Sequence, residues 1–139
     1  MNRHQARELA FSLLFEHEFD KERAVAEMYD TAKASRDAEE SKYVRTVIEG
    51  VAEHEAEIEA LIAEASRGWS VSRISRVALS ILKLSIYEML YMPEIPIRVS
   101  LNEAIELTKD FAEEEARAFV NGILNTVADR AKEGRKDEA

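Results

Sequence analysis

The segment at residues 77–91 limits the possible folds of this chain more than any other. Of its 15 residues, 11 are apolar or aromatic, and Lys83 and Glu88 are the two charged ones. A helix that is apolar on nearly every side has to be covered by other elements, so this segment is predicted to be the central, buried helix. Pro93 and Pro96 are expected to end it.

Apolar residues recur at helical spacing along the rest of the chain, and no stretch alternates as a strand would. Asn2 is expected to cap the first helix, and Gly68 is a candidate C-cap before the central one. Helices are predicted at about residues 2–19 and 21–34, in two segments that meet near His54, and at 77–91, 101–111 and 115–131. The prediction is an all-α chain of about seven helices in a single domain, with a loop at 35–40 and a charged tail.

Three local features predict where a helix starts and where elements pack together. Ser100 is followed by Glu103 three residues later, which is the pattern of a capping box at a helix start. Gly122, with Ala118 one turn before it, could form a small-residue patch that lets another element approach closely. Trp69 is expected to anchor the packing between the two halves.

Composition narrows the class of protein. The chain has 46% hydrophobic residues, 4 Gly and 2 Pro, as expected of an ordered helical protein, and no Cys, which excludes disulfides and thiolate metal sites. The first residues are polar, and no apolar run is long enough to span a bilayer. A cytoplasmic protein is therefore expected.

The net charge of −9 argues against an obvious nucleic-acid footprint. The acidity is concentrated in one half, because residues 20–66 hold 6 basic and 13 acidic residues, whereas residues 67–109 hold 6 basic and 4 acidic ones. RNA binding, if present, should have a modest electrostatic part or need help from a partner.

Motifs for catalysis are missing from the sequence. His54-Glu55 is not followed by a second His one turn later, no glycine-rich phosphate loop occurs, and no Ser lies in a nucleophile elbow. We therefore predict a protein that is not an enzyme, with no catalytic residues, no metal and no cofactor.

The first helix carries a row of four side chains that are each four residues apart: Arg3, Arg7, Phe11 and Phe15. Two guanidinium groups followed by two aromatic rings would suit single-stranded RNA, with phosphate contacts and a stacking surface. The alternative is that Phe11 and Phe15 belong to the core and the arginines are solvated.

Lys83 and Glu88 allow two interpretations as well. Burying a carboxylate on such an apolar helix costs free energy unless the carboxylate is paired with a donor or remains exposed to water. Glu88 could lie at a solvated rim, or it could make a polar contact at the edge of a protein-binding face.

Five ordered sequence blocks resemble the NusB family of transcription antitermination factors. They are Arg3 to Glu8 with Leu13 to Phe15, Trp69 with Arg73-Ile74, Ile81 to Leu84 with Tyr87 to Met89, Ile95-Pro96 with Val99 to Phe111, and Phe119 to Leu124. The resemblance covers nearly the whole chain. It implies two packed helical bundles, here at about residues 1–66 and 67–132, with a charged tail at 133–139.

The resemblance also implies a function. The expected protein binds the boxA element of ribosomal RNA leaders together with NusE, a ribosomal protein, and supports processive transcription of ribosomal RNA operons by RNA polymerase. Some family members form homodimers. The same domain also begins some RNA cytosine methyltransferases, but a chain of this length is expected to be the stand-alone factor. The alternative is a helical adaptor that binds a basic protein through its acidic half and has no direct RNA contact.

Site residues follow from the resemblance by position. The RNA-binding set it implies is Arg3, His4, Arg7, Phe15, Lys83, Glu115 and Phe119, and the partner-binding set is Glu88 and Phe15. Two departures stand out. The N-terminal segment has fewer basic residues than that of many members, and Ala78-Leu79 replaces a common Asp-Arg pair.

Overall fold

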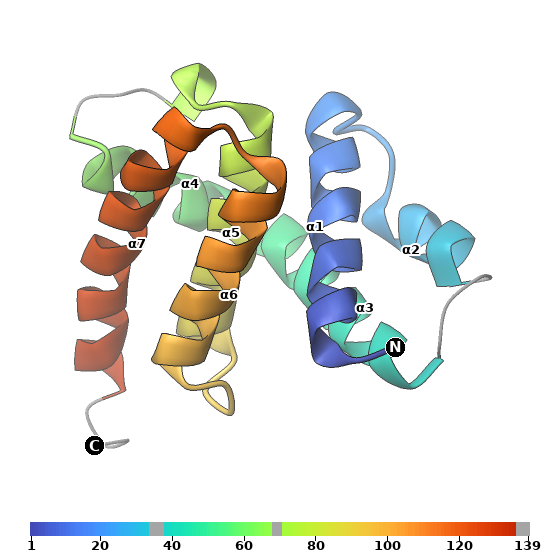
Figure 1. The fold of residues 1–139 in the computed structure, drawn as a ribbon. Coiled ribbons are helices and arrows are strands. Elements are labelled where there is room, and N and C mark those ends of the chain that lie inside the picture. The colour runs from blue at the N-terminus through green and yellow to red at the C-terminus, as the bar shows by residue number, and fades with distance from the viewer. Residues whose placement is uncertain (34–37, 68–70, 136–139) are drawn as a thin grey trace.

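The computed structural model describes residues 1–33, 38–67 and 71–135 and contains seven α-helices in those ranges (Figure 1). The helices are α1 (Arg3–Phe19), α2 (Val25–Lys33), α3 (Ala38–Glu53), α4 (Glu55–Ala65), α5 (Arg76–Tyr91), α6 (Ile97–Phe111) and α7 (Glu114–Gly134), and a 3₁₀ turn, η1 (Val71–Arg73), precedes α5. The all-α prediction is confirmed.

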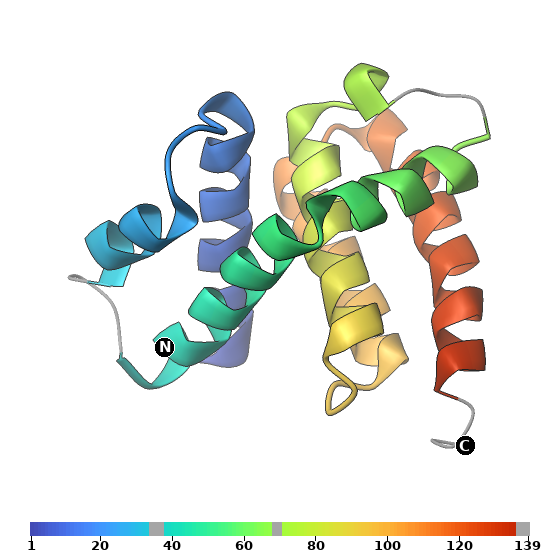
Figure 2. The ribbon, with the colours of Figure 1, turned by 180° about the vertical axis from the view of Figure 1, so that it is seen from behind.

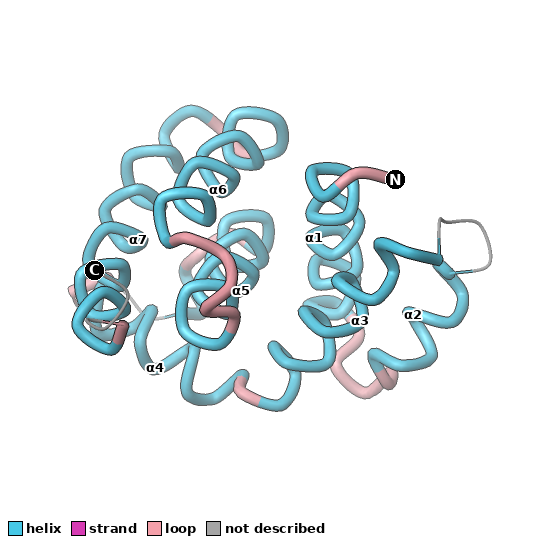
Figure 3. Tube along the Cα trace, turned by 90° about the horizontal axis from the view of Figure 1, so that it is seen from below, coloured by secondary structure: helices cyan, strands magenta, loops and turns pink. Residues whose placement is uncertain are grey.

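The helices form two groups that share one core. Helices α1, α2 and α3 pack together on one side, and α5, α6 and α7 pack together on the other (Figure 3). Helices α3 and α4 run as an almost continuous diagonal across the back of the molecule (Figure 2), so that α4 contacts α5 and α7. Although α4 falls within the predicted N-terminal segment of residues 1–66, it thus packs mainly on the C-terminal group.

Helix α5 is the centre of the fold, as its apolar sequence predicts. It contacts α1, α3, α4, α6 and α7, and 12 of its residues are buried. Its start is capped by Ser75, whose hydroxyl accepts a hydrogen bond from the Ala78 amide at 3.2 Å. At the start of α1, Asn2 and Gln5 form a reciprocal capping box, which confirms Asn2 as the N-cap.

The start of α6 differs from the prediction. The helix begins at Ile97, directly after Pro96, and no side chain caps it. Ser100 therefore lies inside the first turn and not at the N-cap. Its hydroxyl donates a hydrogen bond to Glu88 instead, so the capping box predicted for Ser100 and Glu103 is wrong.

The role predicted for Gly122 is also wrong, because a Cβ added there would meet nothing within 4 Å and Ala118 is exposed. The close approach occurs at Gly50, where an added Cβ would lie 2.2 Å from the ring of Tyr87. Helix α4 is followed by Arg67, which has a positive φ of 52°. The predictions for Gly68 and Trp69 fall outside the described residues.

No helix in the described part of the chain combines the length and the apolar character needed to cross a membrane.

Candidate nucleic-acid interface

A buried polar cluster joins the two helix groups. The Glu88 carboxylate on α5 accepts hydrogen bonds from Arg7 Nε at 2.8 Å and Arg7 Nη2 at 3.2 Å, from Ser100 Oγ at 2.7 Å, and from the Tyr43 hydroxyl. Arg7 Nη1 also donates to Glu103 Oε1 at 3.3 Å. Four helices, α1, α3, α5 and α6, thus contribute to one charge-assisted network.

Burial and mutual pairing shape the protonation of this cluster. Burial lowers the pKa of Arg7, but the hydrogen bond and the charge of Glu88 outweigh that effect and raise it. Burial raises the pKa of Tyr43, and the neighbouring Glu88 carboxylate raises it further. Tyr43 therefore remains a protonated donor at physiological pH.

This cluster corrects two sequence predictions. Arg7 is 4% exposed and Glu88 is 0% exposed, and both are fully engaged inside the protein. Neither can touch RNA or a partner in this arrangement. The prediction that Arg7 contacts RNA is therefore wrong, and so are both interpretations of Glu88, as a solvated rim residue and as a polar contact at the edge of a protein-binding face. The physical reason is that Arg7, Tyr43 and Ser100 together compensate the cost of burying its charge.

Lys83 is likewise removed from the surface. Its ammonium group donates to Glu18, Glu55 and Glu59 at 2.7, 2.8 and 2.7 Å, and the residue is 1% exposed. Burial lowers the pKa of Lys83, but the hydrogen bonds that it donates to the three carboxylates outweigh this effect and raise that pKa. Lys83 thus ties α5 to α1 and α4, and the prediction that it contacts RNA is not supported by its position.

The exposed part of the basic opening consists of Arg3 and His4. The guanidinium carbon of Arg3 lies 4.5 Å from the centre of the Tyr43 ring, a cation–π distance. His4 is half-buried, and its Nδ1 lies 3.1 Å from Glu103 Oε1. That hydrogen bond raises the pKa of His4 above its usual value.

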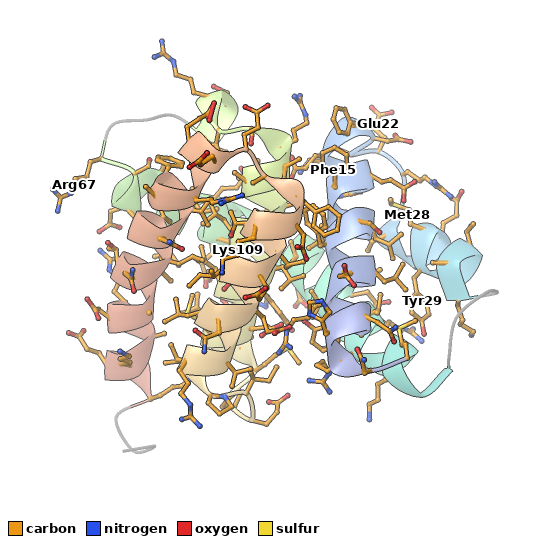
Figure 4. All side chains as sticks on the ribbon, viewed as in Figure 1. Phe15, Glu22, Met28, Tyr29, Arg67 and Lys109 are labelled. Carbon is orange, nitrogen blue, oxygen red and sulfur yellow. The ribbon has the colours of Figure 1, made fainter. Side chains whose placement is uncertain are left out.

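An aromatic row continues along α1 and crosses to α6. Phe11 is buried, Phe15 is half-buried and Phe19 is 63% exposed. The ring centres of Phe11 and Phe15 are 6.3 Å apart, those of Phe15 and Phe19 are 5.1 Å apart, and Phe11 is 4.9 Å from Phe111 on α6. Figure 4 shows Phe15 near the upper end of α1. The guanidinium carbon of Arg76 lies 4.9 Å from the ring centre of Phe19.

A groove of about 630 Å³ lies beside this row, between the start of α5 and the turn from α6 to α7. Its apolar lining includes Ile74, Val77, Phe111 and Phe119. Its polar lining residues are Arg73, Ser75, Glu113 and Glu115. Because Phe111 is 45% exposed and belongs to both the aromatic row and the groove, the two form one continuous surface.

One group of side chains in the described ranges could offer ligands to a metal ion. The ligand atoms of His4, Glu8 and Asp110 all lie within 4.8 Å of one another. His4 already pairs with Glu103, and exposed carboxylates of this kind are common without a metal.

The structure thus places Phe15 of α1 on one surface with Glu115 and Phe119 of α7, although these two helices lie at opposite ends of the sequence. The sequence predictions missed Phe19, Phe111 and Arg76. Phe19 could have been found, because it continues the spacing of four residues from Phe11 and Phe15. Phe111 and Arg76 gave no such signal, because their contacts with α1 arise only from the tertiary fold.

These features define a small all-helical protein with a buried ionic core and an exposed aromatic face. The sequence model of the NusB family matches residues 4–129, and the chain belongs to this family. A relative from Acetivibrio thermocellus, named transcription antitermination protein NusB, is 38% identical over 91% of this chain and 88% of its own length. A relative of the same name from Clostridium acetobutylicum is 35% identical over 96% and 99%.

Solved structures agree. NusB from T. maritima superposes with a TM-score of 0.87 at 33% identity, covering 93% of this chain and 92% of that one. A structure described as the antitermination factors NusB and NusE in complex with dsRNA has a TM-score of 0.81 at 22% identity, covering 94% and 99%, and supports the fold.

Proposed function

We propose that this chain is a transcription antitermination factor that binds boxA-type single-stranded RNA together with the ribosomal protein NusE. In this role it promotes processive transcription of ribosomal RNA operons as part of an RNA polymerase complex. The names of its relatives support the role in antitermination. The structural neighbour that contains NusE and RNA supports the choice of partners. The proposal involves no catalysis and no cofactor.

The observation that carries the proposal is the continuous surface of the aromatic row and the groove. Exposed rings offer stacking platforms for unpaired bases, and a groove beside them can take a base that leaves the stack. Arg73 and Arg76 lie at this surface and can neutralise phosphates. Exposed apolar side chains that gather on one surface, as Phe19 and Phe111 do here, are typical of interaction sites.

Within this proposal, the residues that face RNA are Arg3, His4, Phe15, Glu115 and Phe119. The carboxylate of Glu115 would accept hydrogen bonds from base amino groups or 2′-hydroxyls. Phe15 would also lie close to the protein partner. A homodimer that covers the same surface is a second proposed state, in which RNA and the second copy would compete.

The test is a titration of labelled boxA-like RNA, followed by fluorescence anisotropy, with and without NusE. A scrambled RNA of equal length is the control for sequence. We expect tighter binding of the boxA-like RNA and a further gain with NusE. Phe119→Ala should weaken binding by about 1–3 kcal/mol, the usual value of one stacked base.

Tyr91→Ala is the matched control, because Tyr91 stacks on His54 at the junction of α3 and α4, away from the groove. A thermal melt of each variant separates lost binding from lost folding. If NusE binds tightly and RNA never does, the helical adaptor without direct RNA contact is the correct function.

A further inference from the structure

We propose that Tyr43 is a positioning residue for RNA binding, which holds the Arg3 guanidinium where it meets a phosphate, and that Glu88 fixes Tyr43 for this purpose. The inference rests on the proposed function and deepens it. In this proposal the buried Glu88 cluster contributes to RNA binding indirectly, although Arg7 and Glu88 are themselves too buried to touch RNA.

The first step concerns Arg3. An arginine on the first turn of a helix can adopt many rotamers, and ordering it on binding costs conformational entropy. In this structure the Arg3 guanidinium carbon lies 4.5 Å from the Tyr43 ring centre. A guanidinium stacked on a ring keeps its N–H donors at the edge, where a phosphate can accept from them. The stack therefore orders Arg3 before RNA arrives.

The second step concerns the ring. Tyr43 is buried, and its hydroxyl donates to the Glu88 carboxylate. That carboxylate is itself held by Arg7 from α1 and Ser100 from α6. With its hydroxyl held in this way, the Tyr43 ring keeps one orientation and presents a fixed face to Arg3.

The third step explains why this matters for so acidic a chain. Arg7 and Lys83, which the sequence offers as further RNA-binding cations, are both locked into internal ion pairs. A chain with few surface cations near its RNA gains most when each of them is preorganised. Arg3 is on the exposed side of α1, and Tyr43 supplies that preorganisation.

The experiment is a double-mutant cycle of Arg3→Ala and Tyr43→Leu, read as the affinity for boxA-like RNA in the presence of NusE. Each single variant should weaken binding about threefold to tenfold, the range of a partly desolvated cation–π contact. The double variant should be no weaker than Arg3→Ala alone. Additive losses, or an unchanged affinity for Tyr43→Leu, would overturn the proposal.

Two further variants separate positioning from folding. Tyr43→Phe keeps the ring but removes the hydroxyl that Glu88 holds, so it should melt earlier and weaken RNA binding by less than Tyr43→Leu does. An affinity equal to that of the unaltered chain would show that Glu88 does not fix the ring for RNA binding. The matched control is Arg45→Ala, since Arg45 lies 5.8 Å from the Tyr29 ring on the same helix group but pairs with Glu49. Its RNA affinity should not change.

The outcomes also distinguish this proposal from the proposed function. If Phe119→Ala weakens RNA binding and Arg3→Ala does not, the RNA site stands and the positioning role of Tyr43 is wrong. If the unaltered chain binds no RNA with or without NusE, both are wrong.

Discussion

At the scale of single residues, Glu88 shows how much a buried charge depends on its donors. Arg7, Tyr43 and Ser100 reach it from three different helices, and together they supply four hydrogen bonds. Such a network depends most on its two charged members, because removing Arg7 or Glu88 takes from the other the partner that compensates its burial.

We therefore expect Glu88→Ala to lower the free energy of unfolding by up to about 3–5 kcal/mol, since the buried Arg7 loses its two-pronged carboxylate partner and keeps the contact with Glu103 at 3.3 Å. Glu88→Gln should cost less, because its amide oxygen can still accept hydrogen bonds. The control is Glu106→Ala, whose side chain is 52% exposed and should change the stability by no more than about 0.5 kcal/mol. Urea unfolding followed by circular dichroism measures all three, and a Glu88→Ala variant as stable as the control would contradict the buried cluster.

Replacing Gly122 and Gly50 by alanine should change the stability of the protein in opposite directions. Gly122→Ala should stabilise the protein by up to about 1 kcal/mol, because nothing surrounds the added methyl group and alanine favours a helix interior. Gly50→Ala should destabilise it, because the methyl group would displace the buried Tyr87 ring. Thermal melts of both variants decide, and stabilisation by Gly50→Ala would mean that Tyr87 does not pack on that face of α3.

At the scale of elements, the helices that the sequence predicted best are those whose signals are local. The caps of α1 and the apolar run of α5 depend on residues within one or two turns, and both are confirmed. The start of α6 was misplaced because Ser100 and Glu103 resemble a local cap. Their actual partners, Glu88 and Arg7, are 12 and 96 residues away, a distance that no local pattern reveals.

The end of α5 depends on a residue that follows α7. Arg135 donates to the carbonyl oxygens of Glu88, Met92 and Ile95 at 2.9, 3.2 and 2.8 Å, and for Glu88 and Met92 this adds to a hydrogen bond from a backbone amide. Arg135→Ala should cost about 1–3 kcal/mol. Lys132→Ala, on an exposed face of the last turn of α7, is the control. Equal stability of the two variants in urea would show that this cap contributes little.

Lys83 connects three helices, and its replacement should have a pH-dependent cost. Burial raises the pKa of Glu55, but the hydrogen bonds from Lys21 and Lys83 outweigh it and hold that pKa below its usual range. A carboxylate with a lowered folded-state pKa contributes stability above its unfolded pKa and loses it as the pH falls. Lys83→Met should therefore destabilise the protein most near pH 7, and the difference from the unaltered chain should shrink toward pH 4.

Unfolding curves at several pH values test this expectation. Lys21→Met is a useful comparison, because Lys21 pairs with Glu18 and Glu55 but is 38% exposed, so its loss should cost less. A Lys83→Met penalty that stays constant from pH 7 to pH 4 would contradict the role of the three carboxylates.

At the scale of the whole molecule, the sequence predicted the fold class and much of the candidate surface, but it assigned too many cations to that surface. Phe15 reaches it, as the row of residues four apart on the first helix predicted, and Phe119 reaches it at the position that the family resemblance implied. Arg7 and Lys83 do not reach this surface, because they form ion pairs with carboxylates that lie on other helices. Charge counts along a sequence therefore overestimate the cations available to a ligand.

This burial leads to a prediction for the salt dependence of RNA binding. With Arg7 and Lys83 paired internally, the cations at the candidate surface are Arg3, Arg73 and Arg76, so the chain alone should neutralise at most about three phosphates. The slope of log affinity against log salt should then be no steeper than about −2.1, at about −0.7 for each contact with single-stranded RNA. Arg3→Ala should remove about one such contact, and NusE should steepen the slope by adding its own. Anisotropy titrations from low to high salt measure it, and a slope steeper than about −3 for the chain alone would mean that more cations meet the RNA than Arg3, Arg73 and Arg76.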